Sequence, residues 1–214
     1  MRKLLFIPIS ILMLTFVSCS NGSDDDYYDD MADYEMTYII NIDNATDTTA
    51  IVVITEDGTD SAMTFEVDSY GLKHIELGAG KYHVTATTVT DSLFLDDSFE
   101  ISGGYSYNLN LTKADYILER VTYVVSENPE AYITDKSFTY DGKTYDEIDA
   151  SVIKGQLLVS STWDYNLEDE MPEEVTIYND ANSTTKTKLY RAETFVLYLE
   201  LFELFNNMDM EGFE

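Results

Sequence analysis

Cysteine, histidine, proline and basic residues are all scarce in this chain. Its 214 residues include one cysteine, two histidines and three prolines, and only 12 Lys and Arg stand against 41 Asp and Glu, which gives a formal charge of -29. A single cysteine excludes an intramolecular disulfide and a thiolate metal cluster, so stability has to come from packing. The shortage of cations excludes nucleic acid as a partner, because phosphate backbones are bound by clustered Lys and Arg that displace counterions.

Apolar and aromatic residues, in contrast, are plentiful. They make up 44% and 13% of the chain, which is enough for a hydrophobic core and excludes a wholly disordered chain. The length fits one large domain or two small ones. Gly142-Lys143-Thr144 lacks the upstream glycine of a phosphate-binding loop, so no nucleotide is expected, and no other cofactor is indicated.

The N-terminus carries the pattern of an export signal. Two basic residues precede the apolar run 4–17, which is too short to span a bilayer comfortably, and a small residue stands before the expected cleavage point. Residues 1–18 are therefore predicted to be a signal peptide. Phe16-Val17-Ser18-Cys19 resembles a lipobox, the motif of bacterial lipoproteins, although Phe16 replaces the usual leucine. The resemblance implies that Cys19 is lipidated and anchors the protein to a membrane; the alternative is an ordinary signal peptide with an incidental cysteine.

Residues 19–35 form an acidic, aperiodic stretch that is predicted to be a disordered tether. Repulsion among its carboxylates keeps such a segment extended. Ser23-Asp24-Asp25-Asp26 resembles the short acidic export signal that follows the lipidated cysteine in surface lipoproteins of Bacteroidota. That resemblance implies the outer membrane, facing the medium; the alternative is a solvated spacer. Charge cannot draw so acidic a chain to an anionic bilayer, so the expected membrane contact is the lipid on Cys19.

Behind the tether, residues 36–113 alternate between apolar and polar positions with period two. Met63, Phe65 and Val67, for example, share one face of a predicted strand. Seven short strands separated by brief turns are typical of a small antiparallel β-sandwich. These strands are expected at residues 37–42, 51–55, 63–67, 72–77, 82–89, 92–101 and 105–111.

One turn in this segment is a more specific indicator of the fold than the composition of the segment. Leu77-Gly78-Ala79-Gly80-Lys81-Tyr82-His83-Val84 resembles the turn of prealbumin-like, carboxypeptidase-regulatory-like and PEGA-type sandwich modules, with their leucine, glycine, tyrosine and valine in place. We expect the glycines to adopt positive φ in a tight hairpin, with Leu77, Tyr82 and Val84 facing inward. The resemblance implies a transthyretin-like or Ig-like fold and a role as a spacer, adhesion or binding unit rather than as a catalyst.

Residues 114–214 are predicted to form a second β-rich domain, or an extension of the first sheet. Asp141-Gly142 lies between two aromatic triplets and predicts a type I′ hairpin over residues 138–145. Further strands are expected at residues 116–125, 148–153, 156–161, 175–178 and 187–190.

The C-terminal part of the sequence changes period. Polar positions in residues 192–207 recur at spacings of seven, three and four, which predicts a helix. A long strand is the alternative, because residues 194–199 are rich in aromatic and β-branched side chains. Such an apolar strand could complete a neighbour's sheet by strand addition.

The two histidines are the only general-base candidates with a near-neutral unperturbed pKa. If residues 77 and 82 pair in a hairpin, Glu76 faces His83, and His74 lies diagonally across the same outer face. His74, Glu76 and His83 are therefore a candidate ligand set for a divalent metal. The alternative is an exposed polar strand face.

Trp163, Asp164 and Tyr165 are the best candidate for a recognition surface. A tryptophan near a loop and beside a tyrosine could stack on a sugar ring, while Asp164 accepts hydrogen bonds from sugar hydroxyl groups. The alternative is that the lone tryptophan anchors a small core.

These patterns assemble no set of catalytic residues. Ser151-Val152-Ile153-Lys154 matches the Ser-x-x-Lys of serine acyl enzymes, but that motif requires a helix start and here it lies in a predicted strand. The sequence therefore predicts a non-catalytic binding or assembly protein, lipid-anchored at the cell surface, with a protein or glycan partner. A fimbrillin-like pilus subunit or anchor lipoprotein is one alternative, and a glycan-binding accessory protein is another.

Overall fold

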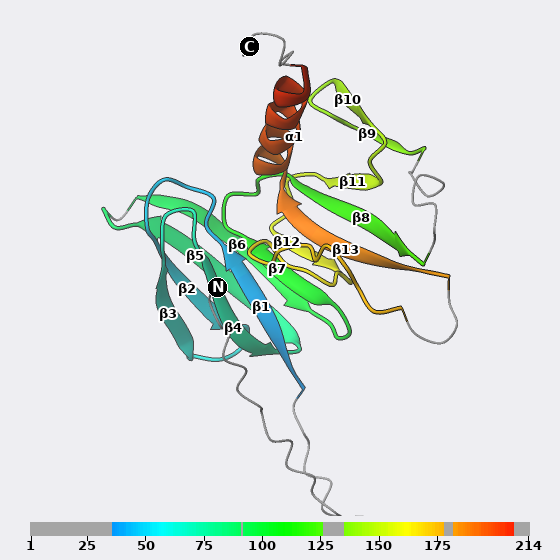
Figure 1. The fold of residues 1–214 in the computed structure, drawn as a ribbon. Helices are drawn as coiled ribbons and strands as arrows, with labels where there is room; N and C mark the ends of the chain where they lie inside the picture. The colour runs from blue at the N-terminus through cyan, green and yellow to red at the C-terminus, as the bar shows by residue number, and fades with distance from the viewer. Residues whose placement is uncertain (1–35, 91, 126–134, 178–181, 208–214) are drawn as a thin grey trace, which may run out of the picture. The chain divides into compact units, whose positions relative to one another are not determined.

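The computed structural model describes residues 36–90, 92–125, 135–177 and 182–207. The predicted signal peptide (residues 1–18), Cys19 and the predicted tether (residues 19–35) lie outside these ranges. Glu35–Glu214 cluster as one unit, and its described part is mainly β with a single C-terminal helix (Figure 1), which confirms the predicted fold class.

The first half of this unit is a β-sandwich, and all seven predicted strands are present. One sheet has the order β3-β2-β5-β6 and is antiparallel throughout. In the other sheet, β1 pairs antiparallel with β4 but parallel with β7. The strands are β1 (Thr37–Asp43), β2 (Ala50–Glu56), β3 (Ala62–Val67), β4 (Leu72–Gly78), β5 (Gly80–Thr88), β6 (Leu93–Ile101) and β7 (Ser106–Asn110).

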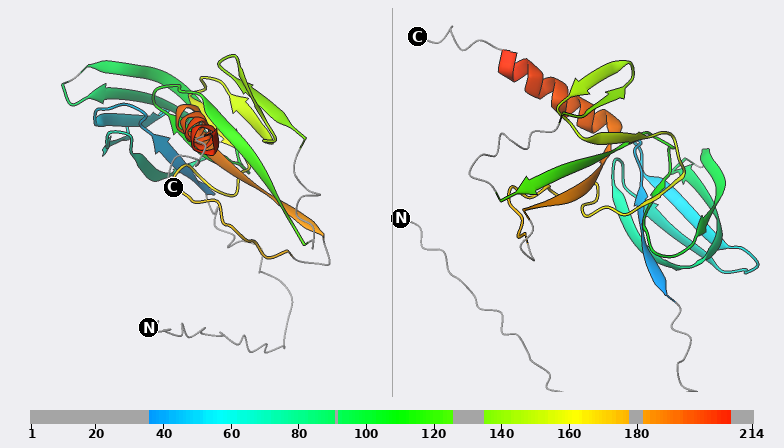
Figure 2. Two further views of the ribbon diagram at one scale, coloured as in Figure 1. Left: turned by 45° about the horizontal axis from the view of Figure 1, so that its top comes forward. Right: turned by 90° about the vertical axis from the view of Figure 1, so that its right-hand side faces the viewer.

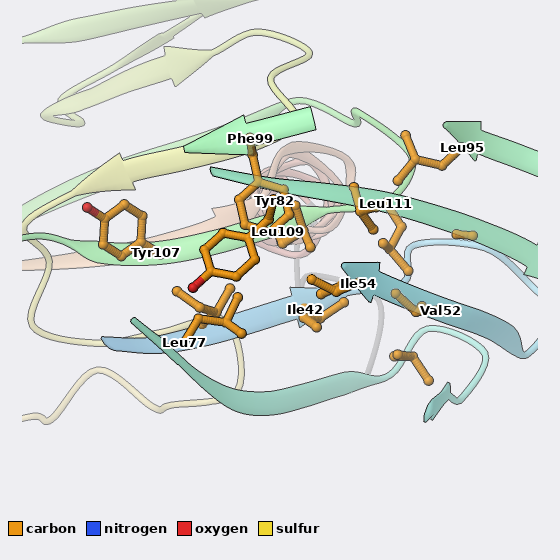
Figure 3. Close-up of a cluster of buried hydrophobic side chains, with 14 of the residues drawn as sticks. Ile42, Val52, Ile54, Leu77, Tyr82, Leu95, Phe99, Tyr107, Leu109 and Leu111 are labelled. Carbon is orange, nitrogen blue, oxygen red and sulfur yellow. The ribbon is translucent and has the colours of Figure 1, made fainter. Parts of the chain in front are cut away.

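The main hydrophobic core lies between these two sheets (Figure 3). Period-two alternation places Ile40 and Ile42 of β1 opposite Val52 and Ile54 of β2, and all four side chains are buried. Each such side chain removed from water contributes about 1.5–3 kcal/mol to folding. Packing of two apolar faces therefore stabilises this half of the molecule without any disulfide.

The turn at Gly78-Ala79-Gly80 differs from the prediction. Leu77, Tyr82 and Val84 are buried, as expected, but β4 pairs with β1 and β5 pairs with β2 and β6, so the predicted hairpin is wrong. The turn carries the chain from one sheet to the other, and neither glycine has positive φ. Tyr82 packs against this turn: its hydroxyl donates to the Gly78 carbonyl at 3.0 Å, and its ring carbon Cε2 would make ordinary van der Waals contact, at 3.5 Å, with a Cβ on Gly80.

The second half adds a three-stranded antiparallel sheet, β11-β8-β13, and a separate hairpin. Asp141 and Gly142 have φ of 48° and 81°, which confirms the predicted type I′ turn. The strand predicted over residues 175–178 is wrong for residues 175–177, which are irregular, and residue 178 lies outside the described ranges. The elements are β8 (Tyr116–Val124), β9 (Ser137–Tyr140), β10 (Lys143–Asp146), β11 (Ala150–Ile153), β12 (Leu158–Ser161), β13 (Ser183–Arg191) and α1 (Ala192–Asn207).

Strand β12 joins the second half to the sandwich. It pairs antiparallel with β7 and completes the sheet β12-β7-β1-β4 (Figure 1). By sequence β12 belongs to the second half, because it begins 45 residues after the expected domain boundary at residue 113. Since it pairs with β7 of the first half, the two halves share a sheet. On its outer face, Val159 packs with Tyr116, Leu118, Trp163 and Leu189 in a second core.

Residues 192–207 form the predicted helix, so the alternative of a strand over residues 194–199 is wrong. Ala192 and Phe195 of α1 pack in a third core against Phe138 and Tyr145 of the hairpin. Because helical spacing brings residues three and four apart onto one face, this contact fixes the first turns of α1 to the hairpin. Among the described residues, no helix has the length and apolar character needed to cross a lipid bilayer.

Candidate functional site

A hollow in the described part of the unit lies on the outer face of the sheet β12-β7-β1-β4, where the second half no longer covers β1. Exposure along that face of β1 rises from Asp43 (0%) through Asn41 (8%) to Ile39 (61%). The hollow has a volume of about 590 Å³, which falls in the range of small-molecule sites. Its lining comes from both halves: Thr37, Tyr38, Ile39, Asn41, His74, Tyr105, Ser106, Trp163, Asp164, Asn166, Glu168 and Asp169.

Trp163 lines this hollow but does not present an exposed ring face on which a ligand could stack. Only 7% of the residue is exposed, and its ring belongs to the second core with Tyr116 and Leu189. A sugar ring stacks on an exposed aromatic face, which Trp163 does not offer. Its position matches the alternative in which the lone tryptophan anchors a core, although the residue also borders the hollow.

Asp164 is used to hold the loop after β12 against β13. Its Oδ1 accepts a hydrogen bond from Lys186 Nζ at 2.7 Å, and its Oδ2 accepts from the Thr187 backbone N at 2.9 Å and from Thr187 Oγ1 at 3.1 Å. Burial raises the pKa of Asp164, but the hydrogen bonds from Lys186 and Thr187 outweigh it and hold the pKa below its ordinary value. Tyr165 continues the attachment through a backbone bridge to Lys188.

Lys188 holds the next part of the same loop through hydrogen bonds to its backbone. This lysine is buried, and its Nζ donates to the backbone carbonyls of Leu167 and Asp169. Burial lowers the pKa of Lys188, partly offset by the nearby charges of Asp169 and Glu119. The loop that carries Glu168 and Asp169 into the hollow is therefore tied down at both of its ends.

Tyr105 and Ile39 supply the exposed apolar surface of the hollow. Tyr105 is 55% exposed and follows two glycines that connect β6 to β7. Sequence reasoning missed it, although an aromatic residue directly after a Gly-Gly turn is a usable signal for an exposed loop position. Of the aromatic residues in the lining, Tyr105 is the most exposed, since Tyr38 is half-buried and Trp163 is buried.

His74 lies beside Asn41 at the other wall. Its Nδ1 is 2.6 Å from Asn41 Oδ1, and Asn41 Nδ2 donates to the Tyr107 carbonyl at 3.1 Å. Because that second bond assigns Oδ1 as the acceptor, Nδ1 of His74 carries the hydrogen, and Nε2 is the acceptor of the neutral ring. Asn41 thus orients an exposed imidazole toward the hollow.

The predicted metal ligands are not brought together. His74 and Glu76 share the outer face of β4, but His83 lies on β5 in the other sheet, where its Nε2 is 2.7 Å from Asp96 Oδ1. Within the described ranges, no three His, Cys, Asp or Glu side chains are grouped so that they could hold a metal ion. The missing β4–β5 hairpin is the physical reason for this separation.

Charge in the hollow is of one sign. Of the described residues that line it, three are carboxylates and none is Lys or Arg. Asp164 is already paired with Lys186, so the charge of the hollow comes from Glu168 and Asp169. Asn166 adds a buried side-chain Oδ1 for which the described residues provide no hydrogen-bond partner, and buried acceptors are usually paired. The site therefore offers acceptors and an aromatic face, and its charge disfavours an anionic ligand.

A second hollow, of about 340 Å³, lies along β8 and the loop between β10 and β11. Its charged side chains bind each other, since Lys136 Nζ is 2.5 Å and Arg120 Nη1 is 3.7 Å from the carboxylate of Asp149. Groups already paired in this way have less to offer a ligand than the acceptors of the larger hollow.

Comparison of the chain with family models, with curated proteins and with solved structures finds no match. Its function therefore has to be inferred from its own residues and geometry.

Proposed function

We propose that the chain is a non-catalytic cell-envelope lipoprotein that binds a neutral glycan in the 590 Å³ hollow. The observation that carries the choice of ligand is the lining: an exposed tyrosine stands beside carboxylate and imidazole acceptors, with no lysine or arginine among the described lining residues. Sugars present an apolar ring face together with hydroxyl donors, and such a combination of surfaces suits them.

Stacking on the ligand, hydrogen bonding to it and positioning of the walls are assigned to different residues in this proposal. Tyr105 stacks on the sugar ring. Glu168, exposed on the loop after β12, accepts hydrogen bonds from hydroxyl groups, as does the Nε2 of His74. Trp163 and Asp164 act indirectly, because they hold the walls in position rather than contact the ligand with a free face or a free oxygen.

Lipid anchoring through Cys19 in the outer membrane remains part of the proposal and is supported by the sequence alone. Protease treatment of intact cells expressing the full chain tests it, with Cys19→Ala as the control. We expect the wild-type protein to fractionate with membranes and to be digested from outside, whereas the Cys19→Ala protein loses its membrane association. Protection of the wild type from protease would contradict surface display.

Titration of the full chain against a panel of neutral and sialylated or sulfated oligosaccharides tests the ligand class. We expect neutral glycans to bind more tightly than anionic ones, and Tyr105→Ala to weaken binding about tenfold, the loss expected for ~1.4 kcal/mol of stacking energy. Tyr70→Ala is the matched control, since Tyr70 is an equally exposed tyrosine outside the hollow. Equal affinities for Tyr105→Ala and Tyr70→Ala would contradict the proposed site.

The fimbrial alternative has less support from the geometry. It depends on the C-terminal segment acting as a donor strand, and residues 192–207 are helical and attached to the hairpin through Phe195. Strand donation by these residues would require α1 to unwind and to leave the third core.

A further inference from the structure

Helix α1 has two apolar faces, and the described residues cover only one of them. Ala192, Phe195, Val196 and Leu199 pack in the third core. The other face, called here the outer face of α1, consists of six large apolar residues that are 44–67% exposed: Leu197, Tyr198, Leu201, Phe202, Leu204 and Phe205. In the right-hand view of Figure 2 the C-terminal turns of α1 extend away from the strands. A helix that is apolar on both faces is typical of a helix covered on both sides.

The outer face is continuous and large enough for a stable interface. Its residues form two rows at spacings of four and three, so their side chains are neighbours along the helix. At about 200 Å² per large apolar side chain, the exposed fractions amount to roughly 700 Å². The largest apolar patch of an ordinary monomer is about 300–600 Å², and standard interfaces bury about 600–1,000 Å² per partner.

Two carboxylates beside the outer face share one cation from within the chain. Lys143 of the hairpin is 3.4 Å from Glu200 Oε1 and 3.1 Å from Glu203 Oε2. The attraction for a basic partner helix is reduced here, because Lys143 already offsets part of the charge of these two carboxylates. A membrane surface is also a poor fit, because helices that lie on membranes carry Lys and Arg, and α1 has neither.

We propose that the outer face of α1 is the interface of a symmetric dimer, in which it packs against the same face of a second copy of this chain. A two-fold interface requires a self-complementary patch, and an apolar stripe flanked by internally paired carboxylates is one. The proposal is independent of the glycan-binding function, since the hollow and the outer face of α1 share no residue.

Cysteine cross-linking of the full chain in the cells that express it tests the dimer. Leu201 lies in the middle of the stripe, so Leu201→Cys should form a disulfide-linked species of twice the chain mass on mild oxidation. Leu93→Cys is the control for random collision, because Leu93 is comparably exposed on β6, away from α1. Addition of Phe202→Glu to the Leu201→Cys chain should reduce the dimer about tenfold or more, since it places an unpaired charge in a desolvated interface.

The dependence on salt concentration distinguishes a second copy of the chain from other occupants of this face. Two copies that each carry a charge near -29 repel one another, so the dimer fraction should rise with ionic strength. A cross-link at Leu201→Cys that is no stronger than at Leu93→Cys would overturn the proposal, as would an adduct to a different protein or a dimer that weakens with salt. Circular dichroism of the Phe202→Glu chain should match the wild type, because the substituted residue is exposed.

Discussion

At the scale of single residues, the most telling feature is an ion pair hidden between the two halves of the unit. Asp43 of β1 is fully buried, and its carboxylate accepts hydrogen bonds from Arg191 of β13 and from the hydroxyl of Tyr116 of β8. Burial, and then the charge of Asp43, raise the pKa of Tyr116, so its hydroxyl keeps the proton that it donates. Residues 148 positions apart are thus held together where the halves meet.

We predict that Arg191→Met lowers the free energy of unfolding by about 3–5 kcal/mol, because it leaves the Asp43 carboxylate buried without its cation. In the double variant Asp43→Leu with Arg191→Met, the free energy of unfolding should fall by much less than the sum of the losses in the two single variants, since no unpaired charge remains. Urea unfolding of the four proteins measures this cycle. Additive losses would show that the two side chains do not act as a pair.

The carboxylate of Asp164 gives the loop beside the hollow a pH dependence. Its pKa is lowered in the folded state, so its contribution to stability is present above the unfolded value of about 3.9 and is lost as pH falls through the folded pKa. Asp164→Asn should therefore destabilise the chain at neutral pH, with a difference from wild type that shrinks below pH of about 4.

Urea midpoints measured across that pH range provide the test. Lys186→Met, which removes one of the donors that lower the pKa, should shift the acid loss of stability to higher pH. A gap between Asp164→Asn and wild type that stays constant from neutral to acid pH would contradict this role.

At the scale of elements, α1 depends on the hairpin that it packs against. Phe138 and Tyr145 stack with ring centroids 5.0 Å apart, and Phe138 lies 5.9 Å from Phe195 of α1. The hairpin in turn depends on its two-residue turn, in which Gly142 has a φ that other residues reach only with strain. The outer face of α1 is therefore presented by a helix whose anchor is the β9–β10 hairpin.

We predict that Gly142→Ala costs about 1–2 kcal/mol and speeds amide hydrogen exchange in α1. Gly58→Ala is a closely matched control, because both glycines have φ of 81° and open space around the missing Cβ. Gly58→Ala should lower the free energy of unfolding by a similar amount, but it should not selectively speed amide hydrogen exchange in α1. Equal exchange of α1 in the two variants would mean that the hairpin does not support the helix.

The elements themselves follow from local patterns, but their partners do not. Period-two alternation predicts β1 to β7 because the side chains that each strand directs into the sandwich core are apolar, and the residues of α1 follow a helical period. The same alternation is satisfied whether β4 pairs with β5 or with β1, since Leu77 and Tyr82 are buried either way. The separation of His74 from His83 could therefore not be foreseen. The sequence does offer a core position for Trp163 as the alternative, but it cannot identify the partners of Trp163 on β8 and β13.

At the scale of the whole unit, the sheet β12-β7-β1-β4 is the feature that joins structure to function. Its inner face packs on the sandwich core, and its outer face is covered by the second half only in part. The hollow lies where this cover ends, so its walls come from Ile39 and Tyr105 on one side and from the loop of Glu168 on the other. Neither half would form this site by itself.

Hydrogen exchange of the full chain, with and without the neutral oligosaccharide that it binds most tightly, tests the central claim most directly. The ligand should slow exchange at residues 37–41 and 163–169, the two sides of the hollow, and should leave the β9–β10 hairpin unchanged. Protection confined to other segments, or no binding of any neutral glycan, would contradict the proposed site.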